Sequence, residues 1–332
     1  MGTKIPFIKN RVFWAIGIVL ILFLLLRISE FHSQPDPATS FEEAVQKFEA
    51  LLAKESQLSL RPEGASRLLH HGHKTDRAFV LLHGLTNCPE QFVPLAKILH
   101  DSGANVIIPR ARYAGFADRL NDLQGEQSGQ DLIDQAAIGL DIAAGLGDRV
   151  GVIGLSGSAV AGAWIAQHRD GIEEMILIAP FFSLDAVPAP VIDTAAAIVS
   201  RFPNFYQWWD SSQKENLKGP NYAYPRFGTR CMADTIQLSR NVRAHLKTHP
   251  LTIGRLDFLL TASDTAANNT LTKSLAESLS QSNTAPVRVY EFPAKLGIPH
   301  DMIDPAQPNA NTEISYAKIL ELLGISHPET RP

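Results

Sequence analysis

Cysteine is scarce in this chain of 332 residues, which contains only Cys88 and Cys231. Two cysteines cannot build a disulfide framework or a cysteine-rich zinc site, although a single bridge between them stays open in an oxidising compartment. The chain also lacks a long basic run and carries a formal net charge of −4. Because nucleic-acid binding depends on clustered positive charge, we expect no nucleic-acid partner.

Patterns of metal ligands are equally sparse. His70, His71 and His73 lie close together, but no cysteine or carboxylate follows at the spacing of a metal site. We interpret this cluster as the solvated end of a strand. The sequence therefore predicts neither a metal ion nor an organic cofactor.

Long apolar runs are confined to the N-terminal region, where fifteen apolar residues extend from Val12 to Leu26. This length lies between a signal-peptide core and a membrane span, and no small-x-small cleavage site follows it. We therefore predict an uncleaved signal anchor in residues 1–33, with secretion after cleavage as the alternative. Three basic residues precede the run and one follows, which predicts a cytoplasmic N-terminus and places the rest of the chain on the outer side of the membrane.

Residues 34–60 are expected to form a linker and one amphipathic helix. Two prolines between Gln34 and Thr39 mark the linker, and Ser40 with Glu43 matches a capping box that begins a helix. Apolar residues then recur at helical spacing, so the helix has one apolar face.

Residues 61–332 alternate short apolar runs with helical patterns. The expected strands are residues 66–72, 78–82, 104–109, 149–154, 175–179, 256–260 and 287–292, and the expected helices include 89–100, 131–146, 271–280 and 311–323. This alternation predicts one α/β domain whose central sheet is mostly parallel, with helices on both faces.

The alternation breaks at about residues 185–250, where eight aromatic residues are interleaved with proline, asparagine, glycine and serine. We predict an inserted helical cap over one end of the sheet. Tyr206, Trp208 and Trp209 are candidate substrate-binding residues, because aromatic rings can form the apolar wall of a pocket for an acyl group. The alternative is that these rings form the core of the cap itself.

The segment from Arg149 to Gln167 joins a strand directly to a helix through Gly154-Leu155-Ser156-Gly157-Ser158. Such a sharp turn forces its central residue into a strained backbone conformation and holds the side chain above the sheet. The sequence therefore predicts that Ser156 is a nucleophile. The fifth position is serine where the usual G-x-S-x-G pattern has glycine, so a simple turn before a packed helix is the alternative.

A serine hydroxyl needs a base to remove its proton and an acid to orient that base. Asp264 directly follows one expected strand, and His300 lies in the loop after the next. The order Ser156, Asp264, His300 is the one expected for an α/β-hydrolase. Asp185 is the reserve candidate for the acid.

Four motifs carry a resemblance to a known family: HGLTNCPEQF at His83–Phe92, GLSGS at Gly154–Ser158, TASD at Thr261–Asp264 and GIPHD at Gly297–Asp301. Together they resemble an α/β-hydrolase of the carboxylesterase and monoacylglycerol-lipase-like branch. Serine aminopeptidase-like hydrolases share the same core. The resemblance implies that the backbone amides of Leu85 and Gly157 form an oxyanion hole.

The expected function is cleavage of carboxylic esters, with short or medium acyl chains or monoacyl lipids as substrates. Thioester or peptide hydrolysis on the same fold stays open, because the same catalytic residues attack any activated acyl group. The alternative outside the enzymes is a non-catalytic binding protein on a hydrolase scaffold. The sequence does not determine the oligomeric state.

Overall fold

The computed structural model describes residues 14–15, 17, 28–185, 187–214, 219–246, 249, 251–282 and 285–326. The apolar run from Val12 to Leu26 therefore falls almost entirely outside the described residues. Among the helices that the structure does describe, none is long and apolar enough to cross a membrane.

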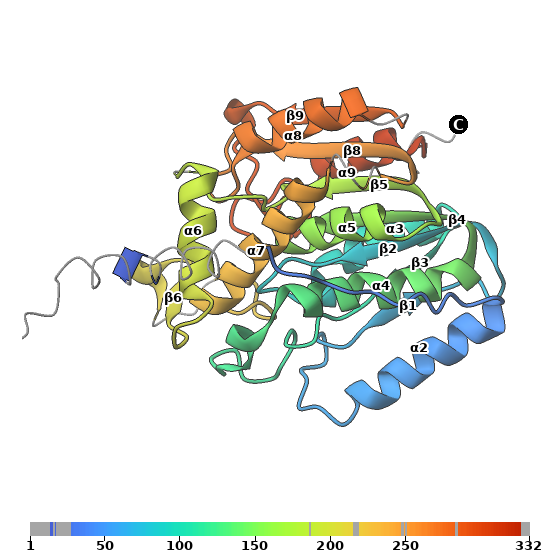
Figure 1. Cartoon of the computed structure of the whole chain (residues 1–332). Coiled ribbons are helices and arrows are strands. Elements are labelled where there is room, and N and C mark those ends of the chain that lie inside the picture. The colour runs from blue at the N-terminus through green and yellow to red at the C-terminus, as the bar shows by residue number, and fades with distance from the viewer. Residues whose placement is uncertain are drawn as a thin grey trace, which may run out of the picture.

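A central sheet of seven strands organises the described part of the chain (Figure 1). Its spatial order is β1-β3-β2-β4-β5-β8-β9, and every neighbouring pair is parallel except the antiparallel pair of β1 and β3. The strands are β1 (Arg67–Leu69), β2 (Thr75–Leu82), β3 (Asn105–Ile108), β4 (Gly147–Leu155), β5 (Ile172–Ile178), β8 (Ile253–Thr261) and β9 (Val287–Phe292). The predicted mostly parallel sheet is confirmed.

Helices cover both faces of this sheet. Alternate residues of β2 separate two buried cores, because successive side chains of a strand point to opposite faces. Val80 and Leu82 pack with residues of α2 (Phe41–Glu55), α4 (Gly129–Leu146), α5 (Ser156–His168), α7 (Thr229–His245) and α8 (Asn269–Ser282). Phe79 and Leu81 pack with α3 (Val93–Asp101) and α9 (Thr312–Leu323) on the other face.

Two predicted helix starts differ in detail from the structure. Ser40 caps α2 by accepting from the Glu43 amide at 3.1 Å, but the Glu43 carboxylate accepts from the Thr39 amide at 2.8 Å, one residue earlier than a capping box requires. The helix predicted from Pro89 begins as a 3₁₀ turn over Pro89–Phe92, and α3 starts only at Val93. Pro94 explains this break, because it lacks the amide that would continue the earlier turn.

The segment predicted as a cap contains α6 (Ala189–Val199), the antiparallel pair β6 (Tyr206–Trp208) and β7 (Arg226–Gly228), and α7. Figure 1 shows α6 and β6 at the left end of the molecule, away from the centre of the sheet. Helix α7 differs from them, because its buried Leu238 and Val242 share one core with Trp164 of α5. The last third of residues 185–250 therefore belongs to the layer that covers the sheet.

The sequence left a bridge between Cys88 and Cys231 open, and the structure does not form it, because both thiols are free and buried. The thiol of Cys231 instead accepts from Gln124 Nε2 at 3.0 Å.

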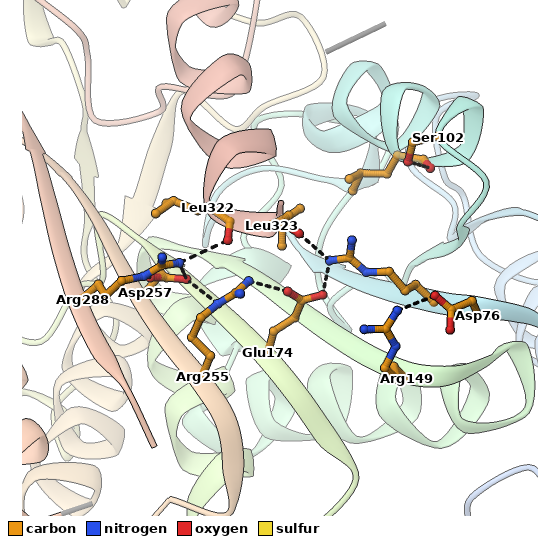
Figure 2. A network of polar contacts seen from close by, with 11 residues as sticks. Asp76, Ser102, Arg149, Glu174, Arg255, Asp257, Arg288, Leu322 and Leu323 are labelled. Atoms are coloured by element: carbon orange, nitrogen blue, oxygen red, sulfur yellow. Dashed lines mark hydrogen bonds and ion pairs between the residues drawn. The ribbon is translucent and has the colours of Figure 1, made fainter. Parts of the chain in front are cut away.

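Charged side chains connect four strands near their amino-terminal ends (Figure 2). Glu174 of β5 bonds Arg77 of β2 and, at 2.5 Å, Arg255 of β8. Asp257 of β8 in turn accepts from Arg255 at 3.1 Å and from Arg288 of β9 at 2.5 Å. Arg77 and Arg288 also donate to the last carbonyls of α9, so this network joins the strands to a helix terminus.

Candidate active site

Ser156 lies at the junction of β4 and α5 with a φ of 57°, in the left-handed region that non-glycine residues rarely adopt. The close approach of strand and helix explains the neighbouring glycine, because a Cβ at Gly154 would lie 2.9 Å from the Cα of Ala159. At the fifth position of the motif, Ser158 is buried and its hydroxyl donates to Gln135 Oε1 at 3.1 Å. The turn thus requires glycine at position 154 and accommodates serine at 158.

The structure brings the three predicted residues together at the carboxyl ends of their strands. His300 Nε2 lies 2.9 Å from Ser156 Oγ, and His300 Nδ1 lies 2.7 Å from Asp264 Oδ2. Both distances are those of hydrogen bonds. The imidazole therefore bridges a hydroxyl and a carboxylate, as a base oriented by an acid must.

Asp264 is held by more than the imidazole. Its other oxygen, Oδ1, accepts from the amides of Ala266 at 2.8 Å and Ala267 at 3.1 Å. Burial alone would raise the pKa of Asp264, but the hydrogen bond and charge of His300 and these two amides outweigh it and lower the pKa. Asp264 is therefore a carboxylate with a fixed orientation at neutral pH.

The hydrogen bond between Asp264 and His300 lowers the pKa of the carboxyl group but raises the pKa of the imidazole. Burial disfavours the charged imidazolium, but the hydrogen bond and charge of Asp264 and the charge of Asp301 outweigh it, so the pKa of His300 lies above its ordinary value. The reserve acid, Asp185, is exposed, and its backbone amide donates to the carbonyl of Ala266. Among the described residues, Asp264 is the carboxylate hydrogen-bonded to His300.

The two predicted oxyanion amides border the cavity that contains Ser156. Gly157 is the second residue of α5, so its amide belongs to the first turn, where helical amides have no partner within the helix. Leu85 follows Gly84, whose own amide donates to the buried side chain of Gln91 at 2.8 Å. Both amides are therefore presented by backbone that other contacts hold in place.

His83, the first residue of the HG pair, is fully buried and fixes this loop. Burial lowers the pKa of His83 to about 4, so the ring is neutral at pH 7. Its Nε2 accepts from the Ala111 amide at 3.1 Å, which leaves Nδ1 to donate to the Gly84 carbonyl at 2.9 Å. Neither His83 nor Gln91 was predicted as a site residue, although both lie within the motif from His83 to Phe92.

A cavity of about 490 Å³ opens beside Ser156 and His300. Trp208 and Trp209, two of the candidate substrate-binding residues, line it, and Trp209 Nε1 donates to Thr86 Oγ1 at 3.0 Å. Most of the other lining residues are apolar, including Phe181, Pro220, Ala223, Pro225 and Met232. The size and the apolar wall are typical of a pocket for a small organic ligand.

Tyr206 is placed differently from its prediction as a substrate-binding residue. It does not line this cavity, and its hydroxyl donates to the Asp122 carbonyl at 2.6 Å. Its ring faces the guanidinium of Arg226, 4.5 Å from the ring centre. Tyr206 therefore holds the cap against the loop before α4, and its assignment to the pocket wall is wrong.

Polar side chains outside the predicted site residues also line the cavity. Arg119 donates to the carbonyls of Ala223 at 2.7 Å and Pro220 at 3.0 Å, and so holds the part of the cap above the site. Asp301 accepts from Gln307 Nε2 at 2.8 Å, and burial raises the pKa of Asp301 to about 6. Within the described residues, no group of three or more potential ligands is arranged to hold a metal ion.

Comparison with known families gives one match over this region. A family model described as the alpha/beta hydrolase fold matches residues 77–302, which include Ser156, Asp264 and His300. No curated protein matches the chain.

Solved structures with a similar backbone include lipases and esterases. A monoacylglycerol lipase from Paleococcus ferrophilus is 15% identical, with a TM-score of 0.59 over 78% of this chain and 97% of that one. A soluble variant of monoglyceride lipase from Saccharomyces cerevisiae is 14% identical, with a TM-score of 0.58 over 78% and 90%. A metagenome-derived lipolytic enzyme is 14% identical, with a TM-score of 0.56 over 80% and 99%. At these identities the likeness shows the shared fold.

Proposed function

The chain belongs to the alpha/beta hydrolase fold family, and on that premise we propose that it cleaves carboxylic esters with Ser156 as nucleophile. The observation that carries the proposal is the pair of hydrogen bonds from Ser156 to His300 and from His300 to Asp264. A hydroxyl, an imidazole and a carboxylate in this order form the constellation that activates a serine.

The first half of the reaction forms an acyl-enzyme. His300 Nε2 accepts the proton of Ser156 as Oγ attacks the ester carbonyl, and Asp264 stabilises the imidazolium that results. The carbonyl oxygen becomes negatively charged, and the amides of Leu85 and Gly157 meet it with about 3–4 kcal/mol of stabilisation per donor. The imidazolium then returns its proton to the leaving alcohol.

The second half regenerates the enzyme with water as the nucleophile. His300 accepts a proton from water as its oxygen attacks the acyl carbonyl, and the same two amides stabilise the second tetrahedral intermediate. The proton passes from His300 back to Ser156 Oγ as the acid leaves.

The proposed substrates are esters of short or medium acyl chains or monoacyl lipids. Support comes from the cavity wall, because Phe181, Trp208, Trp209 and Met232 offer an apolar surface beside the reacting serine. Burial of an acyl chain against such a wall favours binding by about 0.8 kcal/mol for each methylene group. The names of two structural neighbours, a monoacylglycerol lipase and a monoglyceride lipase, agree with this substrate class.

The location of the protein is also a proposal. The apolar run from Val12 to Leu26 and its basic flanks favour a signal anchor with the catalytic domain on the outer side of the membrane. Secretion after cleavage is the alternative, and cell fractionation with N-terminal sequencing of the mature chain distinguishes the two.

Labelling with a fluorophosphonate and turnover of a graded series of p-nitrophenyl esters test the proposed activity. We expect the parent chain to be labelled and Ser156→Ala to be neither labelled nor active. Ser158→Ala is the matched control, because this nearby hydroxyl is buried against Gln135, and it should keep labelling and turnover.

Two results would contradict the proposal. One is a folded parent chain that neither labels nor hydrolyses any ester in the series, which would favour a binding protein on this scaffold. The other is a Ser156→Ala variant that retains the parent rate.

A further inference from the structure

The outward side of α6 is apolar, and two exposed aromatic residues of the loop after it extend this surface. Val191, Ala195, Ile198 and Phe202 are exposed and follow one another at helical spacing, and Phe205 is exposed just beyond them. The exposed fractions are 56% for Val191, 59% for Phe202 and 64% for Phe205. We call Val191, Ile198, Phe202 and Phe205 the apolar cap face.

Charge is missing from this side of α6. Its sole charged residue, Asp193, accepts from Arg243 of α7 at 2.5 Å, so that carboxylate serves the contact between the two helices. The inward side of α6 is apolar as well, because Ile192 and Ala196 are buried in one cluster with Ile236. A surface helix of a soluble domain normally turns charged residues to solvent. A helix that is apolar on both sides therefore indicates that a partner covers its outer side.

The apolar cap face is continuous along the chain with the wall of the catalytic cavity. Phe205 immediately precedes β6, and β6 leads to Trp209, which is half exposed and also lines the cavity. Trp209 reaches the loop of the oxyanion amide through its bond to Thr86. An apolar molecule held at the cap face would thus lie next to an apolar path toward Ser156.

The N-terminal segment 28–38, here called the strap, lies along α4. At one end, the amide and carbonyl of His32 bond the side chain of Gln130 at 3.0 and 2.7 Å. At the other end, the Ala38 amide donates to the Asp141 carbonyl at 2.8 Å. Figure 1 shows this dark blue segment running from beside α7 along α4 toward α2.

The direction of the strap decides at which end of the domain the preceding residues attach. Helix α4 leads into the parallel strand β4, so its first residues, beside His32, lie at the carboxyl ends of the strands. Asn241 of α7 also holds the strap there, by donating to the Ser29 carbonyl at 2.7 Å. Two residues separate Ser29 from the apolar run that ends at Leu26, and the three steps from Leu26 to Ser29 span at most about 10 Å. The run is therefore tethered at the end of the domain that carries the cap and the cavity.

From these observations we propose that the apolar cap face rests on a lipid bilayer, so that ester substrates enter the cavity from the membrane. Three features select a bilayer over a protein partner: the absence of charged residues from the outward side of α6, beyond which Arg201 is the first exposed charge, the continuity of the face with the substrate cavity, and the short tether to a fifteen-residue apolar run. The entry of substrate rests on the proposed esterase function, whereas the contact of the face with lipid does not.

The lipid contact is tested with a fluorophore at the cap face of the full-length chain. Cys88 and Cys231 are both buried, so the new thiol of Phe202→Cys is labelled selectively with the environment-sensitive dye NBD. Val289→Cys is the matched control, because Val289 is an apolar residue of β9 with 42% exposure. With phosphatidylcholine vesicles, we expect the fluorescence emission of the label at position 202 to shift to the blue and to be quenched by doxyl lipids. The emission of the label at 289 should neither shift nor be quenched.

Turnover tests the consequence for the substrate. We expect Phe202→Ser/Phe205→Ser to lower kcat/KM by about tenfold for a monoacyl ester in the bilayer and to leave it unchanged for soluble p-nitrophenyl acetate, because only the bilayer substrate needs the lost apolar contact. Val289→Ser should change neither rate.

The outcomes separate the two proposals. A parent chain that cleaves no ester ends the proposed function, while the fluorophore still decides whether the cap face meets lipid. Labels at 202 and 289 that respond alike overturn the docking proposal. So does a parent chain that is dimeric by light scattering in detergent while Phe202→Ser/Phe205→Ser is monomeric, because a second copy would then cover the face.

Discussion

Replacement of Asp264 by asparagine should remove the negative charge behind His300 and place an NH2 donor opposite Nδ1, which favours the imidazole tautomer that carries its proton on Nε2 and cannot accept from Ser156. Asparagine has nearly the same shape, and its carbonyl oxygen can still accept from the amides of Ala266 and Ala267. The charged centres of imidazolium and carboxylate lie about 4 Å apart when the atoms in contact are 2.7 Å apart, and at an effective dielectric constant of about 20 their attraction is about 4 kcal/mol. This free energy stabilises the transition state, so with the change of tautomer added kcat should fall by at least about 10³-fold.

The pH profile gives a second, independent readout of the same change. His300 acts as a base only when neutral, so activity rises as the pH increases through its pKa. Asp264 raises that pKa in the parent chain, so its removal should lower the pKa and move the acid limb of kcat/KM to lower pH. Initial rates with p-nitrophenyl butyrate between about pH 5 and pH 9 measure both the loss and the shift.

The control for this experiment is Asp185→Asn. Asp185 is exposed and was the reserve candidate for the acid, so its replacement should leave the rate within about twofold and the acid limb in place. The reasoning is refuted if Asp264→Asn loses less than about tenfold in kcat while the acid limb stays where it was. A large loss for Asp185→Asn would refute it as well.

Two further predictions concern stability. Glu174→Ala removes the carboxylate that two arginines share at the amino ends of the strands, and the partly buried positive charge left behind should cost about 2 kcal/mol in urea unfolding. The neighbouring, exposed Glu173→Ala should cost less than about 0.5 kcal/mol. Burial raises the pKa of Asp234 to about 6, so the folded chain holds its proton more tightly than the unfolded chain. Stability from this group is therefore present at low pH and lost as the pH rises through 6. Asp234→Asn should raise the melting temperature at about pH 8 but not at about pH 4, and the gain in the free energy of unfolding at about pH 8 should be at most about 3 kcal/mol.

The elements that carry Ser156, Asp264 and His300 were predictable because each leaves a local signal. Buried parallel strands are continuous apolar runs, and the carboxyl ends of neighbouring strands meet at one edge of the sheet. Residues that directly follow such runs therefore converge, however far apart they lie in the chain. The turn at Ser156 adds a steric signal, because Gly154 stands where a side chain would meet the α5 backbone.

The cap was less predictable, because its packing depends on distant loops. Tyr206 and Trp209 lie three residues apart in one aromatic-rich stretch, yet one bonds the Asp122 carbonyl and the other Thr86 beside the cavity. No periodic pattern separates their roles. Helix α7 has a mixed composition, and its place on the sheet follows from burial of residues such as Val242 against α5.

The residues that hold the oxyanion loop were missed for a different reason. His83 and Gln91 both stand in a quoted motif, but a motif gives residue types and not their hydrogen bonds. Only the structure shows that the Gln91 side chain accepts from the Gly84 amide and that His83 connects this loop to Ala111. Buried polar side chains with backbone partners are therefore the part of the site that a single sequence hides.

The two ends of the sheet have different tasks, and this separates stability from catalysis. At the carboxyl ends, Ser156 and Ala179 have φ values of 57° and 40°, and such strained residues persist only where their surroundings fix them. The surroundings here include the bond from the Phe181 amide to the Ser156 carbonyl, which is local to that end. The ion pairs of Glu174 lie near the opposite ends of the strands and contact neither residue (Figure 2). Glu174→Ala should therefore lower the urea midpoint without changing kcat, and a fall in kcat at temperatures where the variant is fully folded would show that the strained turn depends on the whole sheet.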